Sequence, residues 1–261
     1  MKKNFLDLYK LFEAVEISDL DSEFLKKAMR LTNFNLSTRD FESLEYKKEI
    51  QFLFRTHFFP GFDLDDCLDE VNAEKINSVI AKLKALDSKM FTKMHKYNLK
   101  GVGPGEATLY FILNKGHLGG GASAGVDLVH GSSKYEVKAV TLSSTGHVKD
   151  FKIGGTENLS GIISDAVKLK KKAIKRYTNR DTEINKSQIG EIKRKFPTEW
   201  SKIENEYKNQ AYNYFKEHDV IFMNNKTKKI GEIIAIKKVK KSDIELENIT
   251  SGTIKPAIKV K

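Results

Sequence analysis

Three side chains in the middle of the chain combine the residue types that metal-dependent hydrolysis needs. Asp127 is followed, after eight intervening residues, by Glu136-Val137-Lys138. The apolar, β-branched character of both segments predicts two strands of a hairpin, and Glu136 and Lys138 then share one face of their strand. Two carboxylates that converge beside an ammonium form a hard oxygen site for Mg²⁺, with the ammonium close to a bound water or a phosphate. The pattern therefore predicts a site for phosphodiester hydrolysis.

The motif and its place in the chain resemble the PD-(D/E)XK nuclease superfamily, which has the restriction-endonuclease-like fold. The resemblance covers about residues 101–224, where the expected order of helix, three strands, helix and strand matches the core of that fold. It implies that Asp127 and Glu136 bind the metal ion together with the carbonyl of Val137, and that Lys138 orients or activates the attacking water. The metal polarises the scissile phosphate in this mechanism, and no covalent intermediate is implied.

Two further positions bear on the resemblance. Glu106 opens the helix before the motif, and in the family an acid from that helix often completes the metal shell, so Glu106 is a further catalytic and metal-binding candidate. The alternative for Glu106 is an acid favoured at a helix start by the helix dipole. Val126 stands where the family usually has proline, which is a common departure. For Asp127, Glu136 and Lys138 the alternative is an ordinary salt bridge within a sheet.

Basic residues crowd the segment 159–177, which its apolar spacing predicts as a helix after the motif. In the family a helix at this point commonly borders the substrate cleft, so we expect it to follow a DNA backbone with salt-sensitive affinity. The expected DNA-binding residues are Lys168, Lys171, Lys172, Lys175 and Arg176, and Lys170 belongs to the same run. The alternative is a solvated helix face, which is what a run of charges usually forms.

Composition favours a polyanionic partner. The chain has 261 residues with 46 Lys and Arg against 35 Asp and Glu, a net charge of +11. Only six of the basic residues are arginines, which favours contacts to phosphates over the reading of base edges. Cys67 is the only cysteine, so an internal disulfide and a zinc site of several thiolates are excluded. With no signal peptide at its start and no apolar run of membrane-spanning length, the sequence predicts a cytoplasmic protein without a membrane partner.

Periodicity and the resemblance together predict an α/β protein. We expect a restriction-endonuclease-like core, a mixed central sheet flanked by helices, behind an α-helical N-terminal module. The module is assigned to residues 1–100, and the catalytic domain with a β-rich C-terminal extension to residues 101–261. Helices are expected at 5–15, 22–31, 37–58, 72–98, 106–113, 159–177 and 200–215. Strands are expected at 126–129, 135–140, 147–153, 220–223, 230–239, 244–249 and 254–260, and residues 116–125 are expected to form a glycine-rich loop.

Several other motifs do not fit their required context. Residues 119–124 match a dinucleotide-binding glycine pattern, but they precede a strand and follow a helix, which is the reverse of a Rossmann site. The sequence contains no phosphate-binding P-loop, and its six histidines lack metal-ligand spacing, which disfavours a zinc nuclease. Gln210 and Tyr214 match the Gln-Xaa₃-Tyr element of exonuclease-type members of the superfamily. They lie far downstream of Lys138, so we interpret this match as coincidence.

The combined hypothesis is a Mg²⁺-dependent DNA endonuclease in which Mn²⁺ substitutes for Mg²⁺. Its expected partner is double-stranded DNA, and the analogy with restriction enzymes, which often cut as dimers, suggests a homodimer. A role in a bacteriophage or in bacterial defence fits this activity. Two alternatives remain open: a non-catalytic DNA-binding or packaging protein that retains the fold, and an RNA-directed nuclease.

Overall fold

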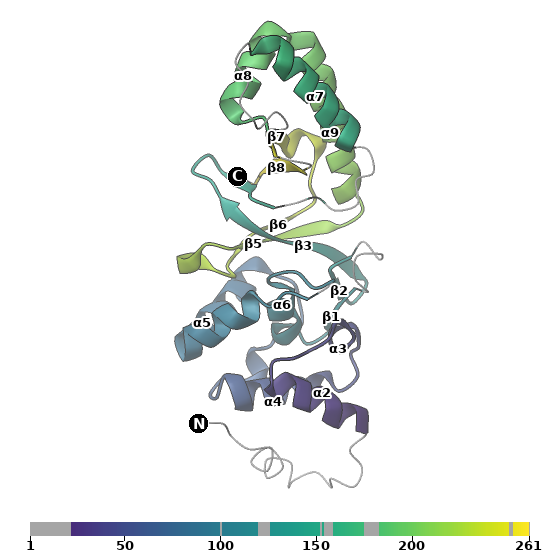
Figure 1. Cartoon of the computed structure of the whole chain (residues 1–261). Helices are drawn as coiled ribbons and strands as arrows, with labels where there is room; N and C mark the ends of the chain where they lie inside the picture. The colour runs from purple at the N-terminus through teal and green to yellow at the C-terminus, as the bar shows by residue number, and fades with distance from the viewer. Residues whose placement is uncertain are drawn as a thin grey trace.

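The structure, a computed structural model, describes residues 22–99, 101–119, 126–151, 153, 159–174, 183–250 and 253–260. The helix predicted at 5–15 and the residues Lys175 and Arg176 lie outside these ranges. Figure 1 shows an elongated molecule in which strands cross the middle, with one group of helices at each end. No helix among the described residues is long and apolar enough to cross a membrane.

The helices of the first half are α2 (Ser22–Thr32), α3 (Thr38–Glu42), α4 (Lys47–Phe58), α5 (Ala73–His95) and α6 (Glu106–Ile112), with a short 3-10 turn η2 (Leu64–Asp66). The helices of the second half are α7 (Leu159–Ala173), α8 (Lys186–Lys195) and α9 (Pro197–Phe215), with 3-10 turns η4 (Thr227–Lys229) and η5 (Lys241–Asp243). The strands are β1 (Gly116–Leu118), β2 (Leu128–His130), β3 (Ser133–Leu142), β4 (His147–Lys149), β5 (Asp219–Asn224), β6 (Ile233–Lys237), β7 (Ile244–Thr250) and β8 (Thr253–Lys259).

Strand β3 organises the sheet. One side of β3 pairs with β2, which continues to β1, and both of these pairings are antiparallel. The other side pairs with β5 in parallel, with Glu136 opposite Val220 and Lys138 opposite Phe222. The far end of β3 continues through β4 to β8 and β7, again antiparallel. The chain is thus a mixed α/β protein with N-terminal helices and a mainly antiparallel sheet flanked by helices, which confirms this much of the predicted fold class.

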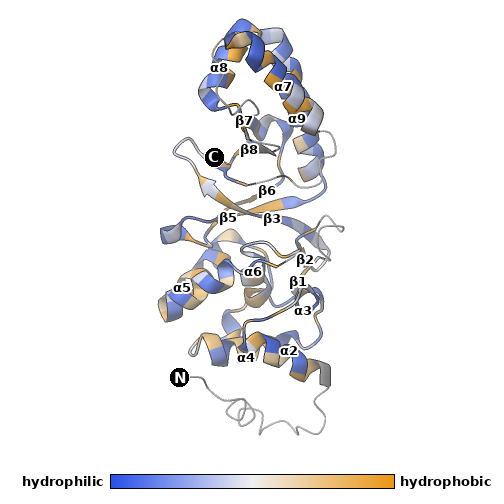
Figure 2. Ribbon diagram, viewed as in Figure 1, coloured by the Kyte–Doolittle hydropathy of each residue, from blue (hydrophilic) through white to orange (hydrophobic). Residues whose placement is uncertain are grey.

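The two faces of β3 and β5 pack against different hydrophobic clusters. Side chains alternate between the faces of a strand, so Val137 and Ile221 join a cluster with α2, α4, α5 and α6, whereas Val140 and Phe222 join one with α7, α8 and α9. Figure 2 shows these central strands in the colour of hydrophobic residues, between helices of mixed hydropathy. The domain boundary near residue 100 stays a prediction, although the first cluster contains side chains from both sides of it.

Two predicted helices have interruptions that apolar spacing did not reveal. The segment predicted as one helix at 37–58 is two helices, because Tyr46 adopts a left-handed conformation (φ 56°) between α3 and α4. Leu44 lies in this connection and is 47% exposed. In α5, Asp87 leaves the helical conformation, and its carboxylate accepts hydrogen bonds from the backbone of Lys89 (2.9 Å) and Met90 (2.8 Å). Asp87 therefore caps the second half of α5 in the manner of a helix start.

Three more elements differ from the sequence prediction. Strand β1 occupies the start of the segment predicted as a glycine-rich loop, and α8 was not predicted at all. Strand β4 ends at Lys149, short of the predicted end at residue 153, because Asp150 is left-handed (φ 67°). The remaining described helices and strands agree with the predicted ones to within a few residues at each end, except that β6 is shorter than the strand predicted at 230–239 and α7 ends at Ala173.

His95 connects the long helix to the sheet and is fully buried. Its ring is stacked on Phe91, and neither ring nitrogen has a hydrogen-bond partner among the described residues. Burial lowers the pKa of His95 from 6.5 to about 4, and the charges of Lys84 and Lys96 add to this effect. The folded protein therefore holds His95 neutral, and protonation of this ring favours the unfolded chain.

We expect the free energy of unfolding to fall as the pH drops from about 6.5 toward 4. In this range His95 binds a proton in the unfolded chain but stays neutral in the folded protein. Between pH 7.5 and 5 this one group is expected to cost about 2 kcal/mol of unfolding free energy. Denaturant unfolding of the wild type and of His95→Leu at both pH values measures it, with His218→Leu as a control at a half-exposed histidine. An equal pH-dependent loss in all three proteins would contradict this role of His95.

Candidate active site

The structure brings Asp127, Glu136 and Lys138 together where β2 meets β3. Asp127 lies directly before β2, and its backbone N–H donates to the carbonyl of Tyr135 at 3.1 Å, which continues the antiparallel ladder by one residue. Asp127 is thereby placed opposite Glu136 on the face of the sheet that Lys138 shares. Both acids and the lysine thus point to the side covered by α9.

Lys138 lies between the two carboxylates. Its Nζ is 3.5 Å from Oδ2 of Asp127 and forms a closer ion pair with Oε1 of Glu136. Asp127 is held from the other side as well, because the same Oδ2 accepts a hydrogen bond from the backbone N–H of Val137 at 2.8 Å. The backbone N–H of Val137 and the ammonium of Lys138 therefore hold Oδ2 of Asp127 in place next to β3.

A fourth residue, Tyr214, completes the cluster from the last turn of α9. Its hydroxyl donates to Oε1 of Glu136, and its ring lies beneath the ammonium of Lys138 at 5.5 Å from the ring centroid. Tyr214 belongs to the Gln-Xaa₃-Tyr match, which we interpreted as coincidence because it lies far downstream of Lys138. Distance along the chain does not keep Tyr214 from the cluster, because α9 returns to the sheet just before β5, which pairs with β3. Whether the match itself is coincidence stays a prediction. The other member of the match, Gln210, is half-buried.

Glu106 is buried at the start of α6, with only 4% of its surface exposed. Its Oε1 accepts a hydrogen bond from the backbone N–H of Gly103 at 2.7 Å, whereas its Oε2 has no partner among the described residues. Gly103 permits this contact, because a Cβ at that position would lie 2.6 Å from the same Oε1. Burial raises the pKa of Glu106 to about 9, with a further contribution from the charge of Asp127, so Glu106 holds a proton at neutral pH in this arrangement.

The charges of the cluster keep the side chain of Lys138 protonated. Burial opposes the charged form of Lys138, but the carboxylates of Asp127 and Glu136 outweigh burial and raise the pKa of this lysine. Burial also raises the pKa of Glu136, although Lys138 counteracts the shift. Tyr214 keeps its proton as well, because burial raises the pKa of its phenol. Lys138 is therefore suited to orient a water or balance negative charge, and not to remove a proton from water.

The donor set suits a hard divalent cation, although the ligands are not gathered into a complete shell. Among the described residues, no three His, Cys, Asp or Glu side chains are grouped so as to hold a metal ion. Asp127 and Glu136 supply two carboxylates. The N–H of Val137 points toward Asp127, and the carbonyl of Val137 points in the same direction, because the N–H and C=O of one strand residue lie on the same edge of the strand. The Oε2 of Glu106 is buried without a partner, and a cation bound there would displace the proton that Glu106 holds at neutral pH. An ion bound here must compete with the ammonium of Lys138.

The helix expected to bind DNA, α7, offers fewer available charges than its sequence suggests. Lys170 is buried and donates to the carbonyl of Glu183 at 2.6 Å. Lys168 pairs with Asp165 at 2.8 Å, while Lys171 and Lys172 are exposed. The DNA-binding assignment of α7 stays a prediction.

Comparison with known proteins gives no relative. No protein-family model, no curated protein and no solved structure matches the chain.

We expect Lys138→Met to destabilise the protein by about 3 kcal/mol at pH 8, because it leaves two neighbouring carboxylates without their buried counter-charge. The loss is expected to shrink toward pH 5, since Glu136 already has a raised pKa and takes up a proton once Lys138 is gone. Denaturant unfolding at both pH values measures this effect. The double variant Glu136→Gln with Lys138→Met is the control and is expected to regain part of the stability. A loss in Lys138→Met that does not depend on pH would show that charge is not the cause.

Proposed function

We propose that the protein is a metal-dependent DNA endonuclease that hydrolyses phosphodiester bonds with an activated water. The observation that carries this proposal is the cluster in which Lys138 meets Asp127 and Glu136, whose charges also act on the buried carboxyl group of Glu106. A cluster of this kind in a purely structural role would gain little, because a buried ion pair is often no more stabilising than packed apolar side chains. Perturbed titratable groups concentrated at one place are typical of active sites.

The arrangement of elements supports the finer fold proposal, a restriction-endonuclease-like core. The chain runs from α6 through the antiparallel strands β1, β2 and β3 to α9, and then to β5, which lies parallel to β3. Two of these elements differ from the predicted core, in which β2, β3 and β4 were the three strands and α7 was the helix that follows them. The proposed metal ligands stand at the junction of β2 and β3, as in the predicted motif. Strand β4, helices α7 and α8 and strands β6, β7 and β8 are then additions to this core.

In the proposed reaction, the residues of this chain have separate tasks. When bound, Mg²⁺ supplies positive charge to the scissile phosphate and lowers the pKa of a coordinated water. Asp127 and Glu136, with the Val137 carbonyl, would hold the ion, and Glu106 would complete the shell only after a shift of its side chain. Lys138 keeps its proton and orients the attacking water or balances the charge that develops on the phosphate. Tyr214 is a positioning residue, because its hydroxyl fixes the carboxylate of Glu136.

A non-catalytic DNA-binding or packaging protein is the second candidate. The observation that favours it is that Lys138 already contacts both carboxylates and offsets one of their two negative charges, so less charge is left to bind an ion. Tight, salt-sensitive DNA binding without metal-dependent cutting would select this candidate. Cleavage of RNA and not DNA in a parallel substrate panel would instead select an RNA-directed nuclease.

Cleavage of duplex and branched DNA with Mg²⁺ or Mn²⁺ tests the proposal. We expect Asp127→Asn and Glu136→Gln to lower the rate by about 1,000-fold or more, because each removes a charged ligand of the metal, and EDTA to abolish cutting. Glu70→Gln is the matched control, since Glu70 is an exposed acid that pairs with Lys75. Retention of full activity by either site variant would defeat the proposal.

The proposal also predicts a specific effect of Tyr214→Phe. This change removes one hydroxyl and leaves the ring in place, so the Glu136 carboxylate loses a hydrogen bond but the packing of α9 is kept. A hydrogen bond to a charged group contributes about 1.5–3 kcal/mol, so we expect kcat to fall by about 10- to 100-fold. Single-turnover cleavage measures the loss, and the pH profile of the rate should shift as Glu136 titrates differently. Tyr212→Phe, at a half-buried tyrosine of the same helix, is the control. Unchanged kinetics in Tyr214→Phe would remove Tyr214 from the mechanism.

A further inference from the structure

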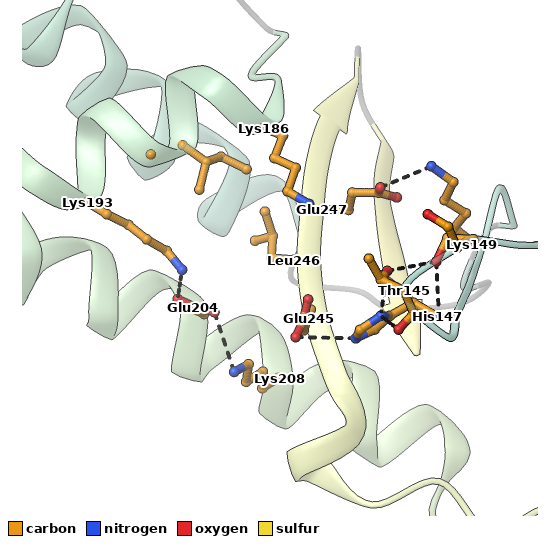
Figure 3. A pocket seen from close by; sticks show the side chains of 15 residues that line it. Thr145, His147, Lys149, Lys186, Lys193, Glu204, Lys208, Glu245, Leu246 and Glu247 are labelled. Atoms are coloured by element: carbon orange, nitrogen blue, oxygen red, sulfur yellow. Dashed lines mark hydrogen bonds and ion pairs between the residues drawn. The ribbon is translucent and has the colours of Figure 1, made fainter. Parts of the chain in front are cut away.

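A second site lies away from the cluster, in a pocket with a volume of about 610 Å³ between two helices and the far part of the sheet (Figure 3). The hairpin residues 143–145 and strand β4 form one wall, and α8 and α9 form the opposite wall, with β7 between them. This volume lies in the range of pockets that enclose small ligands. No residue of the pocket belongs to the Asp127, Glu136, Lys138 and Tyr214 cluster.

The pocket is open toward the sheet because β8, which lies between β4 and β7, carries the small residue Ala257 there. Ala257 of β8 pairs with Glu245 of β7, and the register of β4 places Lys149 on its other side. Long side chains of β4 can therefore reach over β8: Lys149 lies 3.3 Å from Glu247, and the His147 ring lies 3.4 Å from Glu245. The register shift between Leu246 and Asn248 leaves Glu247 as an extra residue in β7, and such bulges re-aim side chains.

The pocket contains acids, but each is matched by a base. Glu204 forms ion pairs with Lys193 (2.9 Å) and Lys208 (3.4 Å). Glu245 lies against His147, and Glu247 forms an ion pair with Lys149. Lys186 enters from the first turn of α8 and has no ion pair or hydrogen bond within the described residues (Figure 3). The pocket thus offers one lysine, Lys186, that no carboxylate neutralises.

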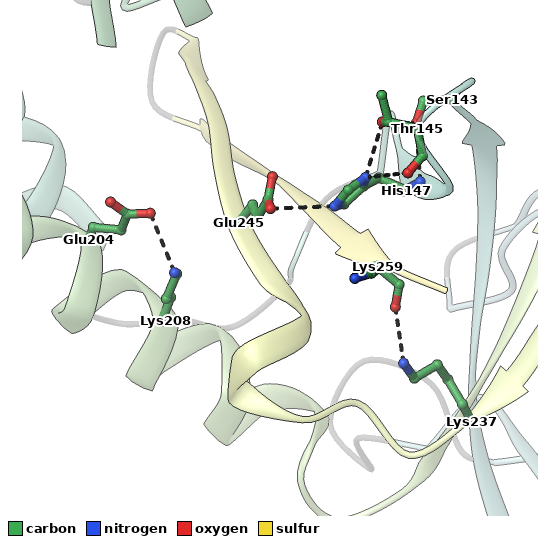
Figure 4. A network of polar contacts seen from close by, with 8 residues as sticks. All are labelled: Ser143, Thr145, His147, Glu204, Lys208, Lys237, Glu245 and Lys259. Atoms are coloured by element: carbon green, nitrogen blue, oxygen red, sulfur yellow. Dashed lines mark hydrogen bonds and ion pairs between the residues drawn. The ribbon is translucent and has the colours of Figure 1, made fainter. Parts of the chain in front are cut away.

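The hairpin wall holds donors and acceptors in fixed positions (Figure 4). The hydroxyls of Ser143 and Thr145 lie 2.9 Å apart, and Nδ1 of His147 lies 3.1 Å from the carbonyl of Thr145. Nδ1 also lies 3.1 Å from the hydroxyl of Thr145. Nε2 is buried with no hydrogen-bond partner among the described residues, and it faces the carboxylate of Glu245. The side chain of Glu245 is 60% exposed, so its carboxylate can accept a hydrogen bond from a ligand N–H group.

A glycine inside α8 leaves room for a ligand. Gly190 lines the pocket four residues after Lys186, so both share one face of the helix. A Cβ at Gly190 would meet no atom within 4 Å, so packing does not require glycine there. Glycine inside a helix costs about 1 kcal/mol relative to alanine. The missing side chain leaves the helix backbone accessible from the pocket at this position.

We propose that this pocket binds one nucleotide unit of the DNA strand, away from the position of cleavage. Lys186 and the hairpin hydroxyls suit a phosphate, and Glu245 suits the N–H groups of a base edge. This inference rests on the proposed function and adds a place where the substrate is held. Lys208 lies six residues before Tyr214 on α9, which is about 9 Å along the helix, so one helix joins the pocket to the cluster.

Binding measurements in full-length Glu136→Gln, which removes cutting, test the inference. The probes are short single-stranded and duplex oligodeoxynucleotides, dTMP and inorganic phosphate, followed at fixed salt by fluorescence anisotropy and competition. Gly190→Leu fills the pocket, and Gly161→Leu is its control, because a Cβ at Gly161 in α7 also meets no atom within 4 Å. Lys186→Glu reverses the uncompensated charge without weakening a helix start, and Lys26→Glu on the exposed side of α2 is its control.

We expect Gly190→Leu and Lys186→Glu each to weaken oligonucleotide binding by about 10-fold or more, and both controls to bind as the parent does. We also expect dTMP to displace the oligonucleotide better than phosphate does, because dTMP supplies a base as well. Equal affinity of Gly190→Leu and Gly161→Leu, or no oligonucleotide binding at all, would overturn the inference. The proposed function fails separately, if the wild type does not cut DNA in the presence of Mg²⁺ or Mn²⁺.

Discussion

The contact between the Lys138 ammonium and the carboxylates of Asp127 and Glu136 is the constraint on which the site depends. All three groups are largely withdrawn from water, and charges in such a place persist only if they neutralise each other or bind an ion. The same contact explains the raised pKa of Lys138. A lysine held in this way acts as a fixed positive charge, which is the property needed beside a phosphate.

The strand order provides the geometry of this contact. Because β3 is central, its two faces pack against separate hydrophobic clusters, and both clusters hold the strand that carries Glu136 and Lys138. Helix α9 covers one of these faces and ends just before β5, which brings Tyr214 to Glu136. Helix α6 supplies Glu106, whose pKa is raised in part by the charge of Asp127. Residues from three separate parts of the sequence therefore meet where β2 pairs with β3.

Local signals predicted more of this arrangement than long-range ones did. The spacing of Asp127, Glu136 and Lys138 is set by a hairpin and a period of two, so the sequence was sufficient to expect them on one face. The role of Tyr214 depends on how α9 returns to the sheet, and no local pattern contains that information, so the Gln-Xaa₃-Tyr match was discarded. The breaks at Tyr46 and Asp87 were hidden for a related reason, since apolar periodicity continues across a change in backbone conformation. The pocket at Ala257 forms where three paired strands meet two helices. The sequence alone did not reveal this packing.

A crystal soaked in Mn²⁺ is the sharpest test of the metal site, because anomalous scattering locates the ion without knowledge of the substrate. We expect an anomalous peak bound by Asp127, Glu136 and the Val137 carbonyl, with the ammonium of Lys138 moved out from between the carboxylates. A crystal at saturating Mn²⁺ with no peak there, and with Lys138 still between Asp127 and Glu136, would contradict it.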